Sequence, residues 1–397
     1  MLTRLTDAFT RKLLSDAGRQ QALRAWHLLR LLGFLYLLRA AYLMATAPSR
    51  MWGVEGPVLR AFWPLVGSFV LITVIDWAIG LDRSNLSPDL RSWLARARLL
   101  NAVPILVLPA HVCVLVAGAH FVTEAPNVGW IARFGWTISC GVATGFIAIS
   151  AAHELLHRPS RFDRLLSGLL LSLACYGTFK VEHVRGHHVD VATPNDPSSA
   201  ELGRSIYGFI PRAIVLNILK AWRIEREVLL RRGLNPIGWH NELIWWTAVS
   251  GACAATLAVA FGPLAAAFFF LQALAAIVLL ESINYVQHYG LRRRRLANGD
   301  YEPVSAIHAW EAPYLASSWF MLNLQRHADH HMRAARPYHL LDCERSAPTL
   351  PASLPGMVVL AYVPFLWRRV MNQRVPASTG GAPEVRGPAA LTESATL

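Results

Sequence analysis

The chain has 397 residues, of which 54% are hydrophobic and only 16% are charged, and its formal net charge is +13. The apolar residues fall in long blocks, a distribution that excludes an ordinary water-soluble domain and indicates an integral membrane protein. The basic residues follow the segments between these blocks instead of gathering on one face of a domain. We therefore attribute the positive charge to membrane topology and contact with membrane lipid, and expect no nucleic-acid partner.

Six apolar blocks are long enough to cross a bilayer, which takes about 20 residues. They cover approximately residues 26–47, 61–81, 100–121, 130–152, 243–261 and 263–286. The Lys and Arg content of the connecting segments alternates, with twelve such residues in 153–241 and none in 122–129. This alternation predicts a multi-pass protein of the cell inner membrane with both termini in the cytoplasm. The expected fold class is all-α, with six transmembrane helices.

Two further apolar stretches, 163–179 and 352–367, are too short to cross and are expected to be interfacial or re-entrant. The segment 371–397 is rich in Pro, Gly, Ala and Ser and is predicted to be a disordered tail, which leaves 1–370 as a single membrane domain. The five cysteines form no C-x-x-C pair, so we expect neither a disulfide framework nor a cysteine-ligated iron domain.

Nine of the fifteen histidines gather in four short windows, HELLH, EHVRGHH, NYVQHYG and LQRHADHH. Spacings of three and four residues put imidazoles on one face of a helix, where neighbouring side chains can reach a common ion. The windows therefore predict a metal site. Its candidate ligands are His153, His157, His183, His187, His188, His288, His327, His330 and His331.

The predicted topology brings all four windows to one side of the membrane. The first window follows the fourth span directly, and the hairpin 243–286 returns the third and fourth windows to the same side. Nine imidazoles exceed the three or four ligands that one zinc ion takes, so we expect a cytosolic histidine-rich helical cap that holds a di-metal site. Imidazole suits iron, copper, nickel and zinc, and the ligand type alone does not choose among them.

The HELLH window by itself is the signature of zinc peptidases, in which Glu154 would be the general base. This remote alternative needs one zinc ion and gives seven clustered histidines no role. A metal transporter or sensor would carry its histidines at mid-membrane depth, whereas here they lie at span edges. The six remaining histidines are expected to bind no metal: His27, His111, His120, His240, His308 and His339.

Several motifs resemble those of the membrane-bound alkane 1-monooxygenases (AlkB-type), relatives of xylene monooxygenase within the fatty acid desaturase and hydroxylase superfamily. The likeness runs through the four histidine windows and through HRPSRFDR, GHHVDVATPNDPSS, SIYGF, LLRRGLN and FGP, and it covers roughly residues 100–370. The resemblance implies a non-haem centre of two iron ions, held by the nine histidines. This centre uses O2 to hydroxylate the terminal methyl of a hydrocarbon, converting an alkane into a 1-alkanol.

In this family, electrons pass from NADH through a separate reductase and a rubredoxin. The alternatives within the superfamily are fatty-acyl desaturation and hydroxylation of an aromatic methyl group. Two departures bear on the substrate: Gln287 stands where the family usually has glutamate, and HAWEA at 308–312 replaces the usual H-S-W-N.

Metal-binding imidazoles need an outer partner on their second ring nitrogen. The candidates near the windows are Glu154, Glu182, Asp190, Asn284 and Asp329. The arginine run Arg292, Arg293, Arg294 and Arg295 follows the sixth span and is interpreted as a membrane anchor that could also steer an acidic electron carrier.

Overall fold

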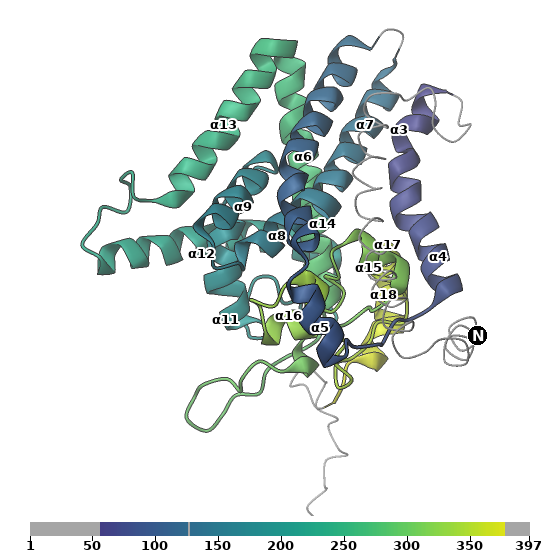
Figure 1. Cartoon of the computed structure of the whole chain (residues 1–397), viewed down its shortest axis with the longest axis vertical. Coiled ribbons are helices and arrows are strands. Elements are labelled where there is room, and N and C mark those ends of the chain that lie inside the picture. Colours follow the sequence, from purple (N-terminus) through teal and green to yellow (C-terminus); the bar gives the residue numbers. More distant parts are fainter. Residues whose placement is uncertain (1–55, 126–127, 378–397) are drawn as a thin grey trace, which may run out of the picture.

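The computed structural model describes residues 56–125 and 128–377, so the first predicted span at 26–47 lies outside it. Within these ranges the fold is helical, and three isolated β-bridges are the only extended pairing. Figure 1 shows long helices standing side by side, with a layer of short helices and loops at one end. The histidine windows belong to this layer and to the helix ends that enter it.

Five helical segments are long and apolar enough to cross a membrane, and each lies within four residues of a predicted span. They are Val58–Ile79 (α3 Pro57–Val66, a π-helical turn Gly67–Leu71 and α4 Ile72–Ile79), Arg98–Glu124 (α6), Trp130–Leu156 (α7 Trp130–Ala143, a π-helical turn Thr144–Ile149 and α8 Ser150–Leu156), Glu242–Phe261 (α13) and Pro263–His288 (α14). Gly262 makes the tight α13–α14 turn at φ +87°, a backbone conformation that glycine adopts readily. Pro263 then supplies a preset first helical residue.

Small residues let these helices approach closely. A Cβ atom added at Gly141 of α7 would lie 2.5 Å from Cβ of Ala275 and 2.6 Å from the carbonyl oxygen of Gln272, both on α14. A Cβ added at Gly118 of α6 would meet the ring of Phe268 at 2.6 Å. Because lipid tails are as apolar as the helices, such contacts stabilise the bundle through close packing. This packing fixes α14, whose last residue is His288.

The short helices form the layer below the spans. They are α5 Pro88–Ala95, α9 Arg161–Leu173, α10 Phe179–Glu182, α11 His188–Asp190, α15 Leu315–Phe320, α16 His327–Met332, α17 Leu354–Ala361 and α18 Pro364–Met371. The predicted short stretches at 163–179 and 352–367 correspond to α9 and to the pair α17 and α18, and none of these is among the candidate spans. A 3-10 turn at Asn372–Arg374 follows α18, and residues 378–397 lie outside the description.

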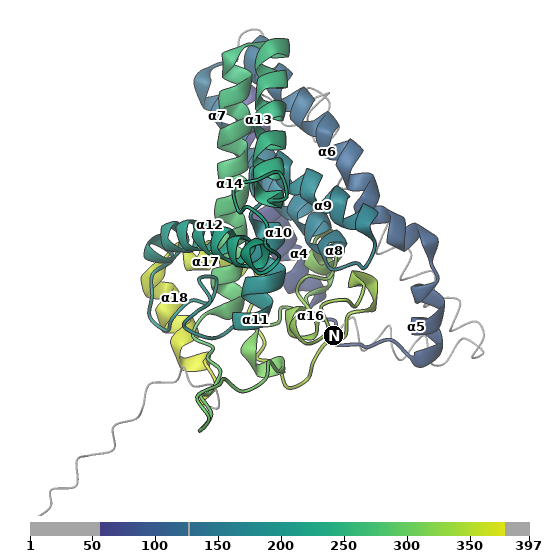
Figure 2. The same cartoon turned by 90° about the vertical axis from the view of Figure 1, so that its left-hand side faces the viewer.

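The sequence analysis did not anticipate one long helix, α12, at Ile206–Arg231. Figure 2 shows that α12 crosses the direction of α13 and α14 at a steep angle. Its buried face packs against α10 and α14. Charged residues interrupt its apolar positions, so it is not among the candidate spans. This helix packs beside the second histidine window.

A buried carboxylate ties the second predicted span to the short-helix layer. Asp76, near the end of α4, is fully buried and accepts the backbone N–H groups of Ala316 (2.7 Å) and Ser317 (3.2 Å). These N–H groups lie in the first turn of α15, where an anion satisfies donors that have no partner within the helix. The contact fixes the layer against the membrane-spanning bundle.

Candidate metal centre

The nine histidines of the four windows converge into two adjacent groups. One group contains His153, His157, His183, His188 and His330, and the other contains His187, His288, His327 and His331. Within each group, one ligand atom per residue lies within 4.8 Å of the others. The groups touch, since the ring centroids of His188 and His331 are 4.7 Å apart. The four windows thus meet in one place, as the sequence predicts.

The first and third windows lie at the ends of helices of the membrane-spanning bundle. His153 lies on α8 and His157 ends that helix, while His288 is the last residue of α14. The fourth window forms α16, in which His327 and His331 are one turn apart and belong to the same group. His330 of the same short helix belongs to the other group. Helix α16 therefore contributes to both positions.

The second window contains a π-helical turn at His183–His187, where the backbone N–H of His188 bonds the carbonyl oxygen of His183. This i to i+5 bond widens the turn relative to an α-helix. His183 consequently shares a group with His188, five residues later, and His187 faces the other group. The spacing of four between His183 and His187 favours a shared ion in a regular helix. The extra residue in the turn changes that pairing.

The nitrogen atoms lie at distances that fit bound cations. Nε2 of His188 is 3.1 Å from Nε2 of both His183 and His330, and Nε2 of His327 is 3.0 Å from His288 and 3.1 Å from His331. Ligands about 2.0–2.1 Å from one ion stand about 3 Å apart when adjacent. The Nε2 atoms of His157 and His187 are buried without a hydrogen-bond partner. The donor set thus fits two metal ions of the imidazole-binding class.

Burial keeps most of these imidazoles neutral, which is the form that binds metal. Burial lowers the pKa of His157 to about 4, and it lowers the pKa of His183, His188 and His330 well below the ordinary value. His187 differs: burial acts to lower its pKa, but the charge and hydrogen bond of Asp196 outweigh burial and raise it. Because a carboxylate accepts hydrogen bonds, the 3.0 Å contact with Asp196 places a proton on Nδ1 of His187.

None of the five residues predicted to orient the histidines is hydrogen-bonded to one of the nine in the described ranges. The carboxylate of Glu154 accepts hydrogen bonds from the guanidinium of Arg158 at 3.1 Å and from the backbone N–H of Tyr338 at 3.0 Å. Asp329 binds Arg333 and Arg336. The carboxylate of Glu154 is thus engaged in structural contacts, which speaks against a peptidase base.

The other three predicted residues also have partners other than the nine histidines. Glu182 and Asp190 both face Lys220, at 3.7 Å and 2.7 Å. Asn284 donates to the buried carboxylate of Glu281 at 3.2 Å. The orienting role of these three residues stays a prediction.

A residue that the sequence analysis missed does make this contact. Oδ2 of Asp196 lies 3.0 Å from Nδ1 of His187, and both side chains are buried. Asp196 is nine residues beyond His187 within the motif GHHVDVATPNDPSS. The NDPSS stretch is a turn sequence, and Asp196 accepts the backbone N–H of Ser198 two residues on. This turn pattern was the sequence feature that could have indicated a role for Asp196.

Gln287 is buried beside His288, and its side-chain amide donates to the carbonyl oxygen of Leu324 at 3.3 Å. The backbone carbonyl oxygen of Gln287 accepts the backbone N–H of Trp310. Trp310 precedes Glu311 of the HAWEA departure. Glu311 is itself buried, and burial raises its pKa to about 7. The two departures from the family pattern are therefore joined by one backbone hydrogen bond beside the third window.

The arginine run makes specific contacts with the layer. Arg292 donates to the carbonyl oxygen of Thr193 and Arg293 to that of Val189, while Arg294 pairs with Glu302 at 2.9 Å. Arg295 is exposed and donates to the carbonyl oxygen of Gly299. Three of the four arginines thus tie the segment after α14 to neighbouring loops.

Five of the histidines outside the windows lie in the described ranges, and neither group includes them. His111 bonds Thr144 at 3.2 Å within the bundle, and His120 pairs with Glu124 at 3.0 Å. His308 bonds Glu302 at 3.2 Å, and His240 stacks against a neighbouring tryptophan. His339 lines the cleft described next, and His27 lies outside the described residues.

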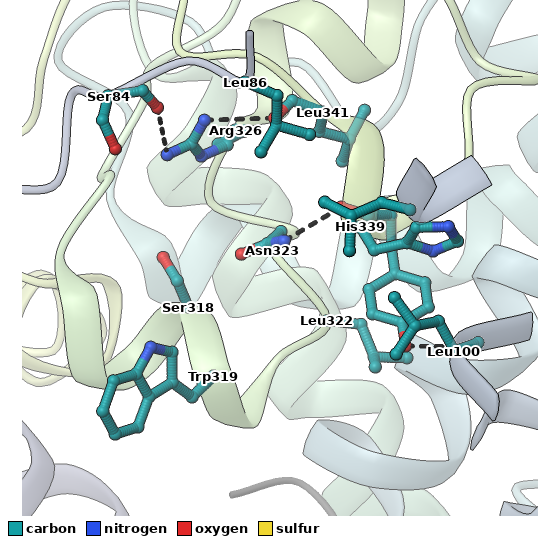
Figure 3. A pocket seen from close by; sticks show the side chains of 12 residues that line it. Ser84, Leu86, Leu100, Ser318, Trp319, Leu322, Asn323, Arg326, His339 and Leu341 are labelled. Atoms are coloured by element: carbon teal, nitrogen blue, oxygen red, sulfur yellow. Dashed lines mark hydrogen bonds between the residues drawn. The ribbon is translucent and has the colours of Figure 1, made fainter. Parts of the chain in front are cut away.

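A cleft of about 540 Å³, partly open to solvent, lies beside the fourth window (Figure 3). Its walls are Leu86, Leu100, Leu322 and Leu341 with several polar side chains, and no member of the nine histidines lines it. Arg326 crosses it and donates to the carbonyl oxygens of Ser84 and Leu341, both at 3.1 Å. Because Arg326 immediately precedes His327, these bonds fix the start of α16.

Comparisons with known proteins agree with this centre. The family model described as fatty acid desaturase matches residues 128–360, which include all nine histidines. The chain is 41% identical to alkane 1-monooxygenase 2 of Pseudomonas aeruginosa, over 90% of this chain and 95% of that protein. It is 40% identical to alkane 1-monooxygenase 2 of Alcanivorax borkumensis, over 78% and 81% of the two chains.

The similarity extends, more weakly, to the hydroxylase component of a xylene/toluene monooxygenase from Pseudomonas putida. That protein is 28% identical over 79% of this chain and 83% of its own length. The resemblance read from the motifs is thereby confirmed. The chain belongs to the fatty acid desaturase family and, within it, to the alkane 1-monooxygenases.

Proposed function

We propose that this chain is a membrane monooxygenase that hydroxylates the terminal methyl group of an alkane to give a 1-alkanol. The observation that carries the proposal is the convergence of nine histidines, seven of them buried, into two adjacent groups in a chain about 40% identical to alkane 1-monooxygenases. An unactivated C–H bond offers neither a dipole nor an acidic proton, so side chains alone cannot attack it. A redox-active metal centre meets that need.

Two iron ions are the proposed cofactor. The five-histidine group would hold one ion and the four-histidine group the other. When bound, the pair would supply O2 activation and electron transfer, which no side chain here provides. The histidines hold the ions, and the surrounding buried carboxylates supply negative charge. The packed layer keeps bulk water from the centre.

The proposed setting is the cell inner membrane, with the short-helix layer and the metal centre in the cytoplasm. In support, the arginine run and the basic helix α12 lie at the histidine-bearing end of the spans, as the positive-inside rule requires of a cytoplasmic face. The predicted span at 26–47 precedes the five described spans in the chain and would bring the number of crossings to six. An even number of crossings would place both termini on that side.

The hydrocarbon would approach from the bilayer. The residues that precede the first and third windows are apolar and buried, among them Ile149 and Ala152 before His153 and Ile283 before His288. A hydrocarbon concentrates in lipid, so a route through this apolar packing delivers the methyl group to the centre without crossing water. The same packing would set the preferred chain length.

Product analysis tests this proposal. Cells that express the chain with a rubredoxin and its NADH-dependent reductase are fed alkanes of graded length, a fatty acid and a methylarene. We expect 1-alkanols from the alkanes, identified by gas chromatography. A double bond in the acyl chain, or a benzylic alcohol as the main product, would favour the two other reactions of the superfamily and contradict the proposal.

The proposed electron donor is a rubredoxin-type small acidic protein that docks beside the second window. Val184, which follows His183, and Val189, which follows His188, are 37% and 60% exposed. Arg185 lies between them in sequence with its side chain 43% exposed, and Arg293 contacts Val189. His188 itself is partly exposed. Exposed apolar groups framed by cations suit an acidic partner, and the short path to the histidines suits electron transfer.

Introducing a negative charge on this surface is expected to weaken donor binding. Val189→Glu should raise the KM for reduced rubredoxin roughly tenfold, equivalent to about 1.4 kcal/mol, with little change in kcat. Leu230→Glu, at an exposed apolar position near the far end of α12, is the matched control and should leave this KM unchanged. A steady-state assay with varied rubredoxin measures both variants. Equal KM values for Val189→Glu and the unmodified chain would place the docking surface elsewhere.

A further inference from the structure

One of the nine histidines has a buried carboxylate partner of its own. Nδ1 of His187 lies 3.0 Å from Oδ2 of Asp196, and the two side chains are 2% and 0% exposed. The opposite ring nitrogen, Nε2 of His187, is buried without a hydrogen-bond partner. The ring is therefore held by one nitrogen and presents the other to the four-histidine group. None of the other eight histidines contacts a carboxylate in the ion pairs of the described ranges.

The loop Val191–Ser199 is built to hold Asp196. Oγ of Ser199 donates to Oδ2 of Asp196 at 2.6 Å, and the backbone N–H of Ser198 donates to Oδ1 at 3.1 Å. Oγ of Ser199 in turn accepts the backbone N–H of Ala192 at 2.8 Å. Ala192 has φ +60°, in the left-handed region that a non-glycine residue rarely adopts. The contacts around Asp196 hold the backbone in this unfavourable conformation.

The charge balance agrees with a role for Asp196. Nine neutral imidazoles add no negative charge, so two divalent ions would bring four positive charges into a buried site. Glu154 and Asp329 are already paired with arginines, and Glu182 and Asp190 face Lys220. Within the described residues, no Lys or Arg forms an ion pair with Asp196. The negative charge of Asp196 can therefore act on a bound metal ion through His187.

We propose that Asp196 is a positioning residue that makes the two metal positions unequal, because it orients His187 and increases its basicity toward the ion of the four-histidine group. The proposal deepens the proposed function and rests on its pair of ions. A carboxylate on the second nitrogen of a metal-bound imidazole fixes the ring and strengthens the metal bond, and its loss costs about 10–100-fold in affinity. The five-histidine position has no such support.

Stepwise iron binding tests this inequality. The full-length chain in lipid nanodiscs is stripped of metal with a chelator and titrated with Fe²⁺ without oxygen, and bound iron per chain is measured at each step. Asp196→Asn keeps the size of the side chain but removes its charge. We expect it to weaken one of the two binding steps about 10–100-fold and to leave the other unchanged. Mössbauer spectra should show the loss of one iron signal.

Two variants separate positioning from folding. Ser199→Ala removes the hydroxyl that holds Asp196 but leaves the carboxylate, and it should weaken the same step to a smaller degree. Glu201→Gln, two residues beyond this loop and paired with Arg204 at the surface, is the matched control and should bind both ions normally. Wild-type binding of both ions by Asp196→Asn, or an equal loss of both, would overturn the proposal. If the unmodified chain with both ions bound formed no alkanol while Asp196→Asn still bound the two ions unequally, the result would count against the proposed function alone.

Discussion

Replacing His187 by alanine is expected to reduce bound iron from about two ions per chain toward one and to abolish product. The change leaves the four-histidine group with three imidazoles and leaves Asp196 buried opposite a void. The loss should exceed the roughly 10–100-fold that removal of an outer partner costs, because here the ligand itself is lost. Iron analysis of the purified chain and gas chromatography of the product measure the two effects.

His120→Ala is the appropriate control for His187→Ala. His120 lies at the far end of α6 from the metal centre, its side chain is 61% exposed, and it pairs only with Glu124. This variant should keep both iron ions and full activity. If His187→Ala retained two ions and formed alkanol at the normal rate, the assignment of His187 as a ligand would be wrong.

Asp329→Ala is expected to destabilise the short-helix layer and to lower iron at both positions. The carboxylate of Asp329 is fully buried, binds Arg333 and Arg336, and accepts the backbone N–H of Asp342 at 2.9 Å. Removing the carboxylate leaves the backbone N–H of Asp342 without its acceptor and costs about 1–3 kcal/mol. Arg333 and Arg336 keep their pairs with Glu344 and Asp342. Because α16 contributes histidines to both groups, its loosening should affect both ions, unlike the selective loss at His187.

Thermal unfolding in detergent, together with iron analysis, measures the effect of Asp329→Ala. The control is Glu227→Ala, which breaks the ion pair between Glu227 and Arg231. The side chains of these two residues are 48% and 77% exposed. An exposed pair contributes about 0–1 kcal/mol, so this variant should unfold near the wild-type temperature. Similar unfolding temperatures for Asp329→Ala and Glu227→Ala would show that the Asp329 network does not hold α16.

The sequence predicted five of the spans and the meeting of the histidine windows, because both depend on strong local signals. Five of the six spans appear within four residues of their expected bounds, since long apolar blocks leave little choice. The convergence of the windows followed from charge counting and from the hairpin at Gly262 and Pro263. Helix α12 was missed because its mixed composition gives no block pattern, and its packing against α10 and α14 stabilises it.

The division of the nine histidines into five and four was not accessible from spacing. A regular helix would pair His183 with His187, and the π-helical turn pairs His183 with His188 instead. The partner of His187 was also missed, because Asp196 reaches it through a turn and not along a helix face. The candidates chosen by closeness in sequence, such as Glu154 and Asp329, turned out to bind arginines. Tertiary contacts decided these points.

The wide turn at His183–His187 has a consequence for how this family can vary. Such a turn holds one residue more than the regular helix on either side. Deleting one residue between His183 and His187 would restore α-helical geometry and place His188 four residues after His183, so these two side chains would stay on one face. His187 would then stand only three residues after His183, on nearly the same face. The extra residue therefore directs His187 to the four-histidine group, and a one-residue deletion there should cost that group a ligand although no histidine has been changed.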